Sequence, residues 1–290
     1  MMATQTAAPR SARSGPPIPT GKFSIADITG KGSGLPNRTV LHGVEGWGKT
    51  SFAAQTVKPI FLETKGETGL ETLVDNGRLP EVPHFPELQT WSDVLAAIDF
   101  LSVGEHNFRT LALDTLNGAE RLCHEHVCAR DFGGDWTEKG FIGYQRGPEV
   151  ALADWREFLA KLDTLRATRR MAIMLLCHTK VQTFKNPEGP DYDRYQPDCN
   201  TKTWSLTHKW ADVVLFGNYE VTIVGGSTGD NAKKGKGKGG QRRMLYTERH
   251  ASYDAKNRLG LPEEVEMGNS SAEAWANFLK ALKTEKEQAQ

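Results

Sequence analysis

The chain has 290 residues, enough for one α/β domain of ordinary to large size with a full hydrophobic core. Its 36 Lys and Arg balance its 36 Asp and Glu, so overall charge does not indicate a nucleic-acid partner and only local clusters can. Four scattered cysteines exclude a disulfide scaffold and fit a cytoplasmic setting, and no apolar run reaches the ~18 residues that a bilayer span requires.

Residues 1–22 are rich in Ala, Ser, Thr and Pro, and we expect a disordered tail there. Beyond them, β-prone runs alternate with helical patterns. Strands are predicted at 39–42, 59–62, 111–113 and 171–176, and helices at 51–57, 91–101, 117–130 and after Pro148. The helix after Pro148 has one apolar face made of Leu152, Trp155, Phe158, Leu159, Leu162 and Leu165. This alternation predicts an α/β fold whose largely parallel sheet carries helices on both faces.

The pattern changes after about residue 210, where short strands joined by turns are predicted at 213–216, 219–224 and 244–247. A basic, glycine-rich run at 233–243 is predicted to be a flexible hairpin tip. We therefore expect one domain over 23–268 that ends in antiparallel strands, followed by a C-terminal helix and tail at 269–290.

A phosphate-loop pattern stands between the first strand and the first helix. It consists of Gly43, Val44, Glu45, Gly46, Trp47, Gly48, Lys49 and Thr50, with Ser51 following. The glycines allow backbone N–H groups and the helix N-terminus to surround the β-phosphate of ATP. We expect Lys49 to bridge the β- and γ-phosphates and Thr50 to bind Mg²⁺. Because both flanking elements are predicted, a chance glycine turn is disfavoured.

Asp114 ends the strand at 111–113, where a carboxylate can hold Mg²⁺ through water, although it could also cap the next helix. Hydrolysis needs a further carboxylate to polarise the attacking water, and Thr115 rather than a glutamate follows Asp114. The second strand ends near Glu63 and Glu67, and we favour Glu67. The alternative is that both are solvated loop acids.

His178 follows the strand at 171–176 and is predicted to sense the γ-phosphate, unless it is simply a packed histidine. Lys256 and Arg258 lie one residue apart, so on a strand both side chains point the same way. Such a pair can neutralise the γ-phosphate of a neighbouring subunit, or it can belong to an ordinary basic surface strand. The run at 124–128 approaches a helical zinc pattern, but helical geometry spreads its side chains over more than one face.

These motifs together resemble the RecA-like P-loop ATPases, and most closely the phage-encoded ATP-binding proteins related to Sak-type single-strand-annealing recombinases. The resemblance covers residues 39–267 and includes Trp136, the runs 140–141 and 143–144, and the run 255–262. It implies a catalytic acid just after the second strand. Lys65 stands near that place in this sequence, and Glu67 matches the acid after a small shift of the alignment. It also implies a homo-oligomer, either ring or filament, in which Lys256 and Arg258 act in trans.

The resemblance further implies that loops near the carboxyl edge of the sheet bind single-stranded DNA. Segment 182–209 combines cations that can bind phosphates with rings that can stack on bases, and segment 233–243 is strongly basic. The predicted DNA contacts are Phe184, Lys185, Arg194, Tyr195, Lys202, Lys233, Lys234, Lys236, Lys238, Arg242 and Arg243. The alternative is that both segments are solvated loops.

The sequence therefore predicts an ATPase that uses ATP and Mg²⁺ and acts on single-stranded DNA in phage recombination, by annealing or strand exchange. The expected setting is the host-cell cytoplasm away from membranes, with a phage single-strand-binding protein as a further partner. Two alternatives stay open: a helicase or helicase-loader-like replication accessory, and a nucleotide-gated binding protein with little turnover.

Overall fold

The computed structural model describes residues 27–224 and 236–288. The chain divides into two units at residues 34 and 35, and the sheet and the candidate site belong to the second unit. No helix in the described ranges is both long enough and apolar enough to cross a membrane.

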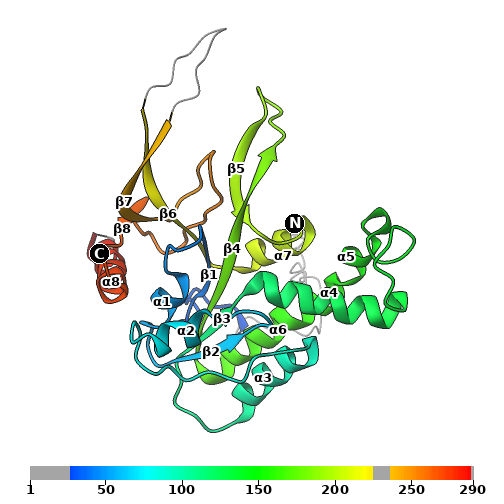
Figure 1. Cartoon of the computed structure of the whole chain (residues 1–290). Coiled ribbons are helices and arrows are strands. Elements are labelled where there is room, and N and C mark those ends of the chain that lie inside the picture. Colours follow the sequence, from blue (N-terminus) through cyan, green and yellow to red (C-terminus); the bar gives the residue numbers. More distant parts are fainter. Residues whose placement is uncertain (1–26, 225–235, 289–290) are drawn as a thin grey trace, which may run out of the picture. The chain divides into compact units, whose positions relative to one another are not determined.

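The second unit is built on one eight-stranded sheet in its described part, with the strand order β2-β3-β4-β1-β6-β7-β8 and β5 paired to β4 (Figure 1). The mutually parallel strands are β1 (Arg38–Gly43), β2 (Pro59–Glu63), β3 (Thr110–Asp114), β4 (Ala172–Phe184) and β6 (Val213–Val224). The antiparallel additions are β5 (Tyr192–Pro197), β7 (Lys236–Tyr246) and β8 (Glu264–Glu266). The predicted fold class, an α/β fold with a largely parallel sheet that ends in antiparallel strands and a C-terminal helix, is confirmed.

Helices cover both faces of this sheet because successive strand residues point to opposite sides. One apolar cluster joins Val40 to helices α3 (Trp91–Val103), α4 (Leu116–Phe132), α6 (Leu152–Arg169) and α7 (Thr201–Trp210). A second cluster joins the neighbouring Leu41 to helices α1 (Lys49–Ala53), α2 (Gly69–Asp75) and α8 (Ser271–Gln288). The apolar face predicted for the helix after Pro148 is the buried face of α6, which confirms that assignment.

Two strands are longer than the sequence indicates. Strand β4 does not end at residue 176 but continues to Phe184, because its second half leaves the parallel sheet and pairs with β5 in a hairpin. The runs predicted as two strands around Gly217 form the single strand β6. The segment 182–209, expected to be a loop, consists of the end of β4, β5 and α7 with their connections. Backbone pairing rather than apolar side chains extends these strands, so hydropathy patterns do not reveal them.

Strands β6 and β7 form a long hairpin whose pairing reaches from Phe216 and Tyr246 to Val224 and Lys236. Residues 236–243 of the predicted hairpin tip therefore belong to strand β7, while Lys233 and Lys234 lie outside the described residues. A short helical turn, η2 (Gly143–Gln145), and α5 (Arg146–Val150) connect α4 to α6.

Candidate nucleotide-binding site

The phosphate-loop residues join the carboxyl end of β1 to the start of α1. Gly46 and Gly48 have φ values of 73° and 100°, a region that side-chain-bearing residues rarely adopt. The two glycines therefore let the loop close over the end of the strand. Lys49 begins α1, and its buried amine donates to the carbonyl oxygen of Gly43 at 3.0 Å. Burial lowers the pKa of the Lys49 amine, and the nearby Asp114 carboxylate opposes that shift.

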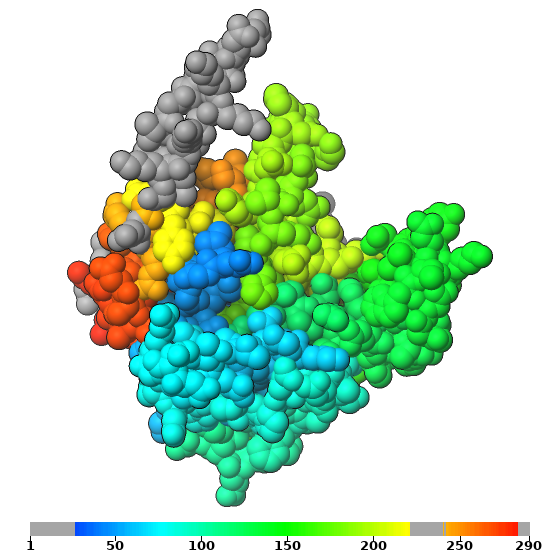
Figure 2. All heavy atoms as spheres, in the orientation of Figure 1, coloured from blue at the N-terminus to red at the C-terminus, as the bar shows by residue number. Residues whose placement is uncertain are grey.

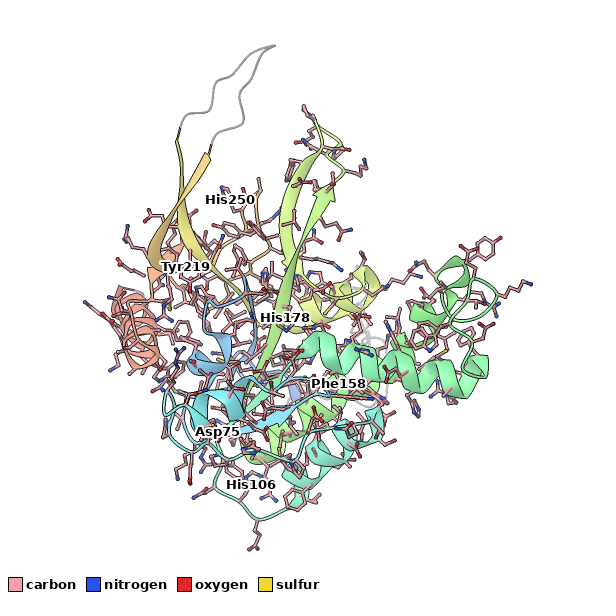
Figure 3. The ribbon with its side chains drawn as sticks, in the orientation of Figure 1. Asp75, His106, Phe158, His178, Tyr219 and His250 are labelled. Atoms are coloured by element: carbon pink, nitrogen blue, oxygen red, sulfur yellow. The ribbon has the colours of Figure 1, made fainter. Side chains whose placement is uncertain are left out.

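The β6–β7 hairpin holds the phosphate loop from the side. The Trp47 indole is buried and donates to the Met244 carbonyl at 3.0 Å. The Tyr219 hydroxyl donates to the Gly46 carbonyl at 2.8 Å, and Arg243 donates to the Trp47 carbonyl at 3.3 Å (Figure 3 labels Tyr219). Gly217 lies so close to the indole that an added Cβ would be 2.5 Å from a ring carbon. The loop is thus fixed by side chains that lie about 170 to 200 residues further along the chain.

Thr50 and Asp114 form the pair expected to hold a divalent cation. The Thr50 hydroxyl donates to an Asp114 carboxylate oxygen at 2.6 Å. Strand β3 carries Asp114 to the same edge of the sheet because β2, β3, β4 and β1 are parallel neighbours. Burial raises the pKa of Asp114 to about 6, and the hydrogen bond from Thr50 opposes the rise. One hydroxyl and one buried carboxylate side by side are oxygen ligands of the kind that Mg²⁺ accepts while keeping several waters, so this pair fits the ion.

Glu67 and His178 meet beside this pair. An oxygen of the Glu67 carboxylate lies 3.3 Å from Nε2 of His178 and accepts a hydrogen bond from the Thr115 hydroxyl at 3.0 Å. The hydrogen bond to His178 lowers the pKa of Glu67, and the same contact raises the pKa of His178. Asn117 fixes the histidine by accepting its backbone N–H at 3.1 Å. The arrangement keeps an ionised carboxylate at the edge of the site.

Glu63 lies elsewhere. Its carboxylate is almost fully buried at the end of β2 and accepts the backbone N–H of Leu70 at 3.3 Å. Burial raises the pKa of Glu63 to about 7. Glu63 does not line the cleft that contains the phosphate loop, whereas Glu67 does.

That cleft has a volume of about 600 Å³ and gathers segments from across the chain. Lys49, Thr50, Asp114, Glu67 and His178 all line it, so the structure brings together five side chains predicted from four separate segments. Val44 and Glu45 are part of the loop but do not line the cleft, whereas Ser51 does.

Sequence reasoning missed part of the cleft wall. Arg78 lines it from the turn after α2, and residues 269–271 line it from the start of α8 and the turn before that helix. Arg243, predicted as a DNA contact, is placed here instead, where it also donates to the carbonyls of Gly268 and Ser270 at 2.9 and 2.8 Å. No local motif marks these residues, because only the folding of β7 and α2 beside the phosphate loop makes them neighbours.

Lys256 and Arg258 lie at the opposite end of the sheet. Lys256 is paired to Val214 on β6, and Arg258 lies 3.8 Å from Asp212, just before that strand begins. Val214 pairs with Val40 of β1, three residue steps before Gly43, and the Asp212 N–H donates to the Arg38 carbonyl, five steps before it, which is about 10 and 16 Å at the usual rise. The Lys256 amine donates to the last carbonyls of α7, at His208 and Ala211. Neither cation therefore reaches the cleft of its own chain, and Lys256 is held by α7.

Several predicted DNA contacts face the interior. Arg194 is buried and pairs with Asp254 at 3.1 Å, and the Tyr195 ring stacks on Phe216 at 5.2 Å between centroids. These side chains pack the second half of β4 and β5 against the rest of the sheet, because that hairpin is not a free loop. In this structure both side chains therefore pack against the protein itself.

Among the other predicted DNA contacts, Lys185, Lys202 and Arg242 are more accessible. Lys185 is exposed beside Asp191, and Phe184 packs on Tyr192 near the same hairpin end. Lys202 pairs with Glu149, and Arg242 pairs with Glu220 and Glu266. Lys236 and Lys238 lie in the first residues of β7.

The run at 124–128 lies on α4, and the described residues contain no group of three or more His, Cys, Asp or Glu able to hold a metal ion.

Fold and site together define the core of a P-loop nucleotide-binding ATPase. The chain matches the family described as AAA domain over residues 35–259, and it belongs to that family. The solved structure of the RadB recombinase is similar at 12% sequence identity, with a TM-score of 0.43, over 82% of this chain and 90% of that one. No curated protein matches the chain.

Proposed function

We propose that this protein hydrolyses ATP as an oligomer bound to single-stranded DNA, in the annealing or strand-exchange step of phage recombination. The observation that carries the ATPase part is the Thr50–Asp114 pair beneath the phosphate loop with the ionised Glu67 beside it. The recombination part, the phage origin and the cytoplasmic setting rest on the sequence motifs described above.

The cleft offers a role to each of its predicted residues. Lys49 would leave the Gly43 carbonyl for the β- and γ-phosphates of ATP. Thr50 would bind Mg²⁺ directly and Asp114 through water, and the ion would neutralise charge on the phosphate oxygens. Glu67 would accept a hydrogen bond from the attacking water and orient it.

Glu67 suits the role of base better than Glu63 for two reasons. A base must be ionised and must face the nucleotide. Glu67 lines the cleft and its pKa is lowered, whereas Glu63 is buried away from the cleft with a pKa of about 7. His178 and Thr115 would keep the Glu67 carboxylate pointing into the cleft, and His178 could respond to the γ-phosphate through that contact.

Arg258 is the better candidate for a residue that acts in trans. More than half of its side chain is exposed and its contact with Asp212 is long, at 3.8 Å, so the guanidinium can move to a neighbouring subunit. The Lys256 amine would have to give up two short hydrogen bonds to α7 before it could do the same. The predicted pair is therefore proposed as Arg258 acting in trans, with Lys256 positioning the segment that carries it.

The β6–β7 hairpin supports a link between DNA and hydrolysis. Tyr219 and Arg243, which pair across the hairpin near its base, contact the phosphate loop, and β7 extends from Arg243 back to Lys236 within the basic run. Two loop carbonyls, at Gly46 and Trp47, are held by this hairpin. DNA that binds the hairpin would therefore shift the groups that shape the phosphate loop.

The test is Mg²⁺-dependent ATP hydrolysis with and without a single-stranded oligonucleotide. Wild type is compared with Lys49→Ala, Arg258→Ala and the control Arg121→Ala, a cation on α4 whose side chain is 75% exposed. We expect DNA to stimulate hydrolysis in wild type and in the control only. If wild type hydrolyses ATP at the same rate with and without DNA, the protein is an ATPase whose partner is something other than DNA.

A mixing experiment tests the trans role directly. A Lys49→Ala subunit retains Arg258, and an Arg258→Ala subunit retains an intact phosphate loop. If Arg258 acts in trans, mixing the two inactive variants restores hydrolysis at the intact loops. If it acts in cis or not at all, the mixture is no more active than the sum of its parts.

A further inference from the structure

A knob made of residues 133–147 stands off the second unit between α4 and α5 (Figure 1, and the green projection in Figure 2). The ATPase site does not use it. Its centre is the buried Phe141 ring, which packs against Phe132, Trp136 and His124. The knob is therefore a folded feature with its own small core.

The backbone of the knob is tightly packed. The N–H of Phe141 donates to Asp135 and its carbonyl accepts the N–H of Gly147, both at 2.8 Å. Added Cβ atoms at Gly140 and Gly143 would be 2.2 and 2.0 Å from backbone oxygens. Only glycine fits these places, so the loop is held in one conformation. A surface held in one conformation in advance loses little entropy when it binds a partner.

This frame holds Tyr144 away from the protein. Its side chain is 99% exposed, and its φ of 48° is one that a tyrosine rarely adopts. Ile142 and Trp136, nearby, are 49% and 44% exposed. Exposed aromatic and aliphatic side chains on a rigid support are typical of a binding surface, where tyrosine and tryptophan supply much of the affinity.

A complementary hollow lies on α2 and the segment after it. It has a volume of about 820 Å³ and contains Leu70, Val74, Val82 and Pro83 among its lining residues. Three carboxylates, of Glu71, Asp75 and Glu81, also line it, together with His84. Figure 3 places Asp75 well away from the knob. We call this hollow the α2 cleft.

We propose that the knob of one copy of this chain docks into the α2 cleft of the next copy. Tyr144 and Ile142 supply apolar side chains for the apolar part of the cleft, and Lys139 and Arg146 at the tip meet its three acids. Glu138 is the one acid among the residues that line the tip with them. The inference rests on the proposed oligomer and names the surface that builds it.

Such a contact is head-to-tail, because knob and cleft are different surfaces of one chain. Repeating this contact from copy to copy produces a ring if the rotation between successive copies closes on itself, and a filament if it does not. Helix α2 also connects the contact to the nucleotide. Leu70 and Val74 line the α2 cleft, while Gly69 and Leu73 line the nucleotide cleft. A knob seated on one face of α2 would therefore influence the residues that face ATP.

The test measures molar mass by analytical ultracentrifugation of the full chain, with Mg²⁺ and a non-hydrolysable ATP analogue. The knob variant is Tyr144→Ala and the cleft variant is Asp75→Lys with Glu81→Lys. The control is Val103→Ala, which removes an 80% exposed side chain at the end of α3. All the changed residues are exposed, and far-UV circular dichroism and melting temperature verify the fold.

We expect wild type and the control to assemble, while each variant alone sediments as a monomer and associates at least tenfold more weakly. The mixture of the two variants is the decisive sample. The intact knob of the cleft variant can enter the intact cleft of the knob variant, so the mixture should form one-to-one dimers that grow no further.

Each of the following results would overturn the proposal. Assembly of Tyr144→Ala at wild-type strength, or no dimers in the mixture, would place the interface elsewhere and leave the proposed oligomer standing. A wild-type chain that stays monomeric with nucleotide and DNA would remove the oligomer itself, whatever the hydrolysis assay shows. Weaker binding of a labelled single-stranded oligonucleotide by Tyr144→Ala, with unchanged assembly, would reassign the knob to DNA.

Discussion

Replacing Trp47 tests whether the hairpin holds the phosphate loop as the contacts indicate. The Trp47 side chain is 1% exposed and packs against Phe52 and Gly217, and its N–H donates to the Met244 carbonyl. A buried tryptophan covers about 150–250 Å². At about 25 cal/mol per Å² this area contributes roughly 4–6 kcal/mol. Measured losses for tryptophan-to-alanine changes in protein cores are about 3–5 kcal/mol.

The lost hydrogen bond adds about 1 kcal/mol because the Met244 carbonyl is left without its donor. We therefore expect Trp47→Ala to lower the free energy of unfolding by about 4–5 kcal/mol. Trp47→Phe keeps an aromatic ring but loses the N–H, so its loss should be about 1–2 kcal/mol. Tyr144→Ala removes an aromatic side chain that is 99% exposed and should change stability by no more than about 0.5 kcal/mol.

The assay is urea unfolding followed by far-UV circular dichroism, together with titration of a fluorescent ATP analogue into the folded variants. Trp47→Ala should also weaken nucleotide binding, because the loop carbonyl that Arg243 holds belongs to this residue. A stability of Trp47→Ala within about 1 kcal/mol of wild type, the size of the hydrogen-bond contribution alone, would refute the packing argument.

Three further predictions concern single side chains. Glu67→Gln should reduce ATP hydrolysis by about 10²–10⁴-fold with unchanged nucleotide affinity, and a parallel loss of affinity would contradict its role as base. Burial raises the pKa of Glu63 from 4.5 to about 7, so the stability that comes with its protonated form is present below pH 4.5 and lost as pH rises through 7. Without nucleotide, Glu63→Gln should therefore be more stable than wild type at pH 8 by up to about 3 kcal/mol, with a smaller difference at pH 5, measured as melting temperatures. Lys256→Met should lower the free energy of unfolding in urea by about 1.5–3 kcal/mol because two short hydrogen bonds to the end of α7 disappear. Arg258→Met should change it by no more than about 0.5 kcal/mol. The reverse order would contradict the contact of Lys256 with α7.

Features that depend only on residues close together in the chain could be predicted from the sequence. The phosphate loop depends on glycines, a lysine and a hydroxyl at fixed spacing within eight residues, and Gly46 and Gly48 adopt the positive φ values that this spacing requires. The fold class follows from apolar strands that alternate with helices, since such strands need cover on both faces. Asp114 could be found because it ends one of those strands.

The identity of the remaining cleft residues depends on strand order and long-range packing. Arg243 is one of six cations in a run of eleven residues, and nothing local distinguishes it from Lys233 or Arg242. It reaches the phosphate loop because β6 pairs with β1 and carries β7 beside it. The sequence predicts Arg194 and Tyr195 as surface residues, yet in the structure Arg194 is buried against Asp254 and the Tyr195 ring stacks on Phe216.

The sequence by itself determined that this chain has a phosphate loop on a parallel sheet. The loop depends on the residue types at eight consecutive positions, and the sheet depends on the alternation of strands and helices along the chain. Only the tertiary structure decided that Glu67 rather than Glu63 faces that loop, that Lys256 is held by α7, and that Tyr144 stands free on a knob. Each of these depends on which distant segments become neighbours, and contacts between residues far apart in the chain leave no fixed spacing to read.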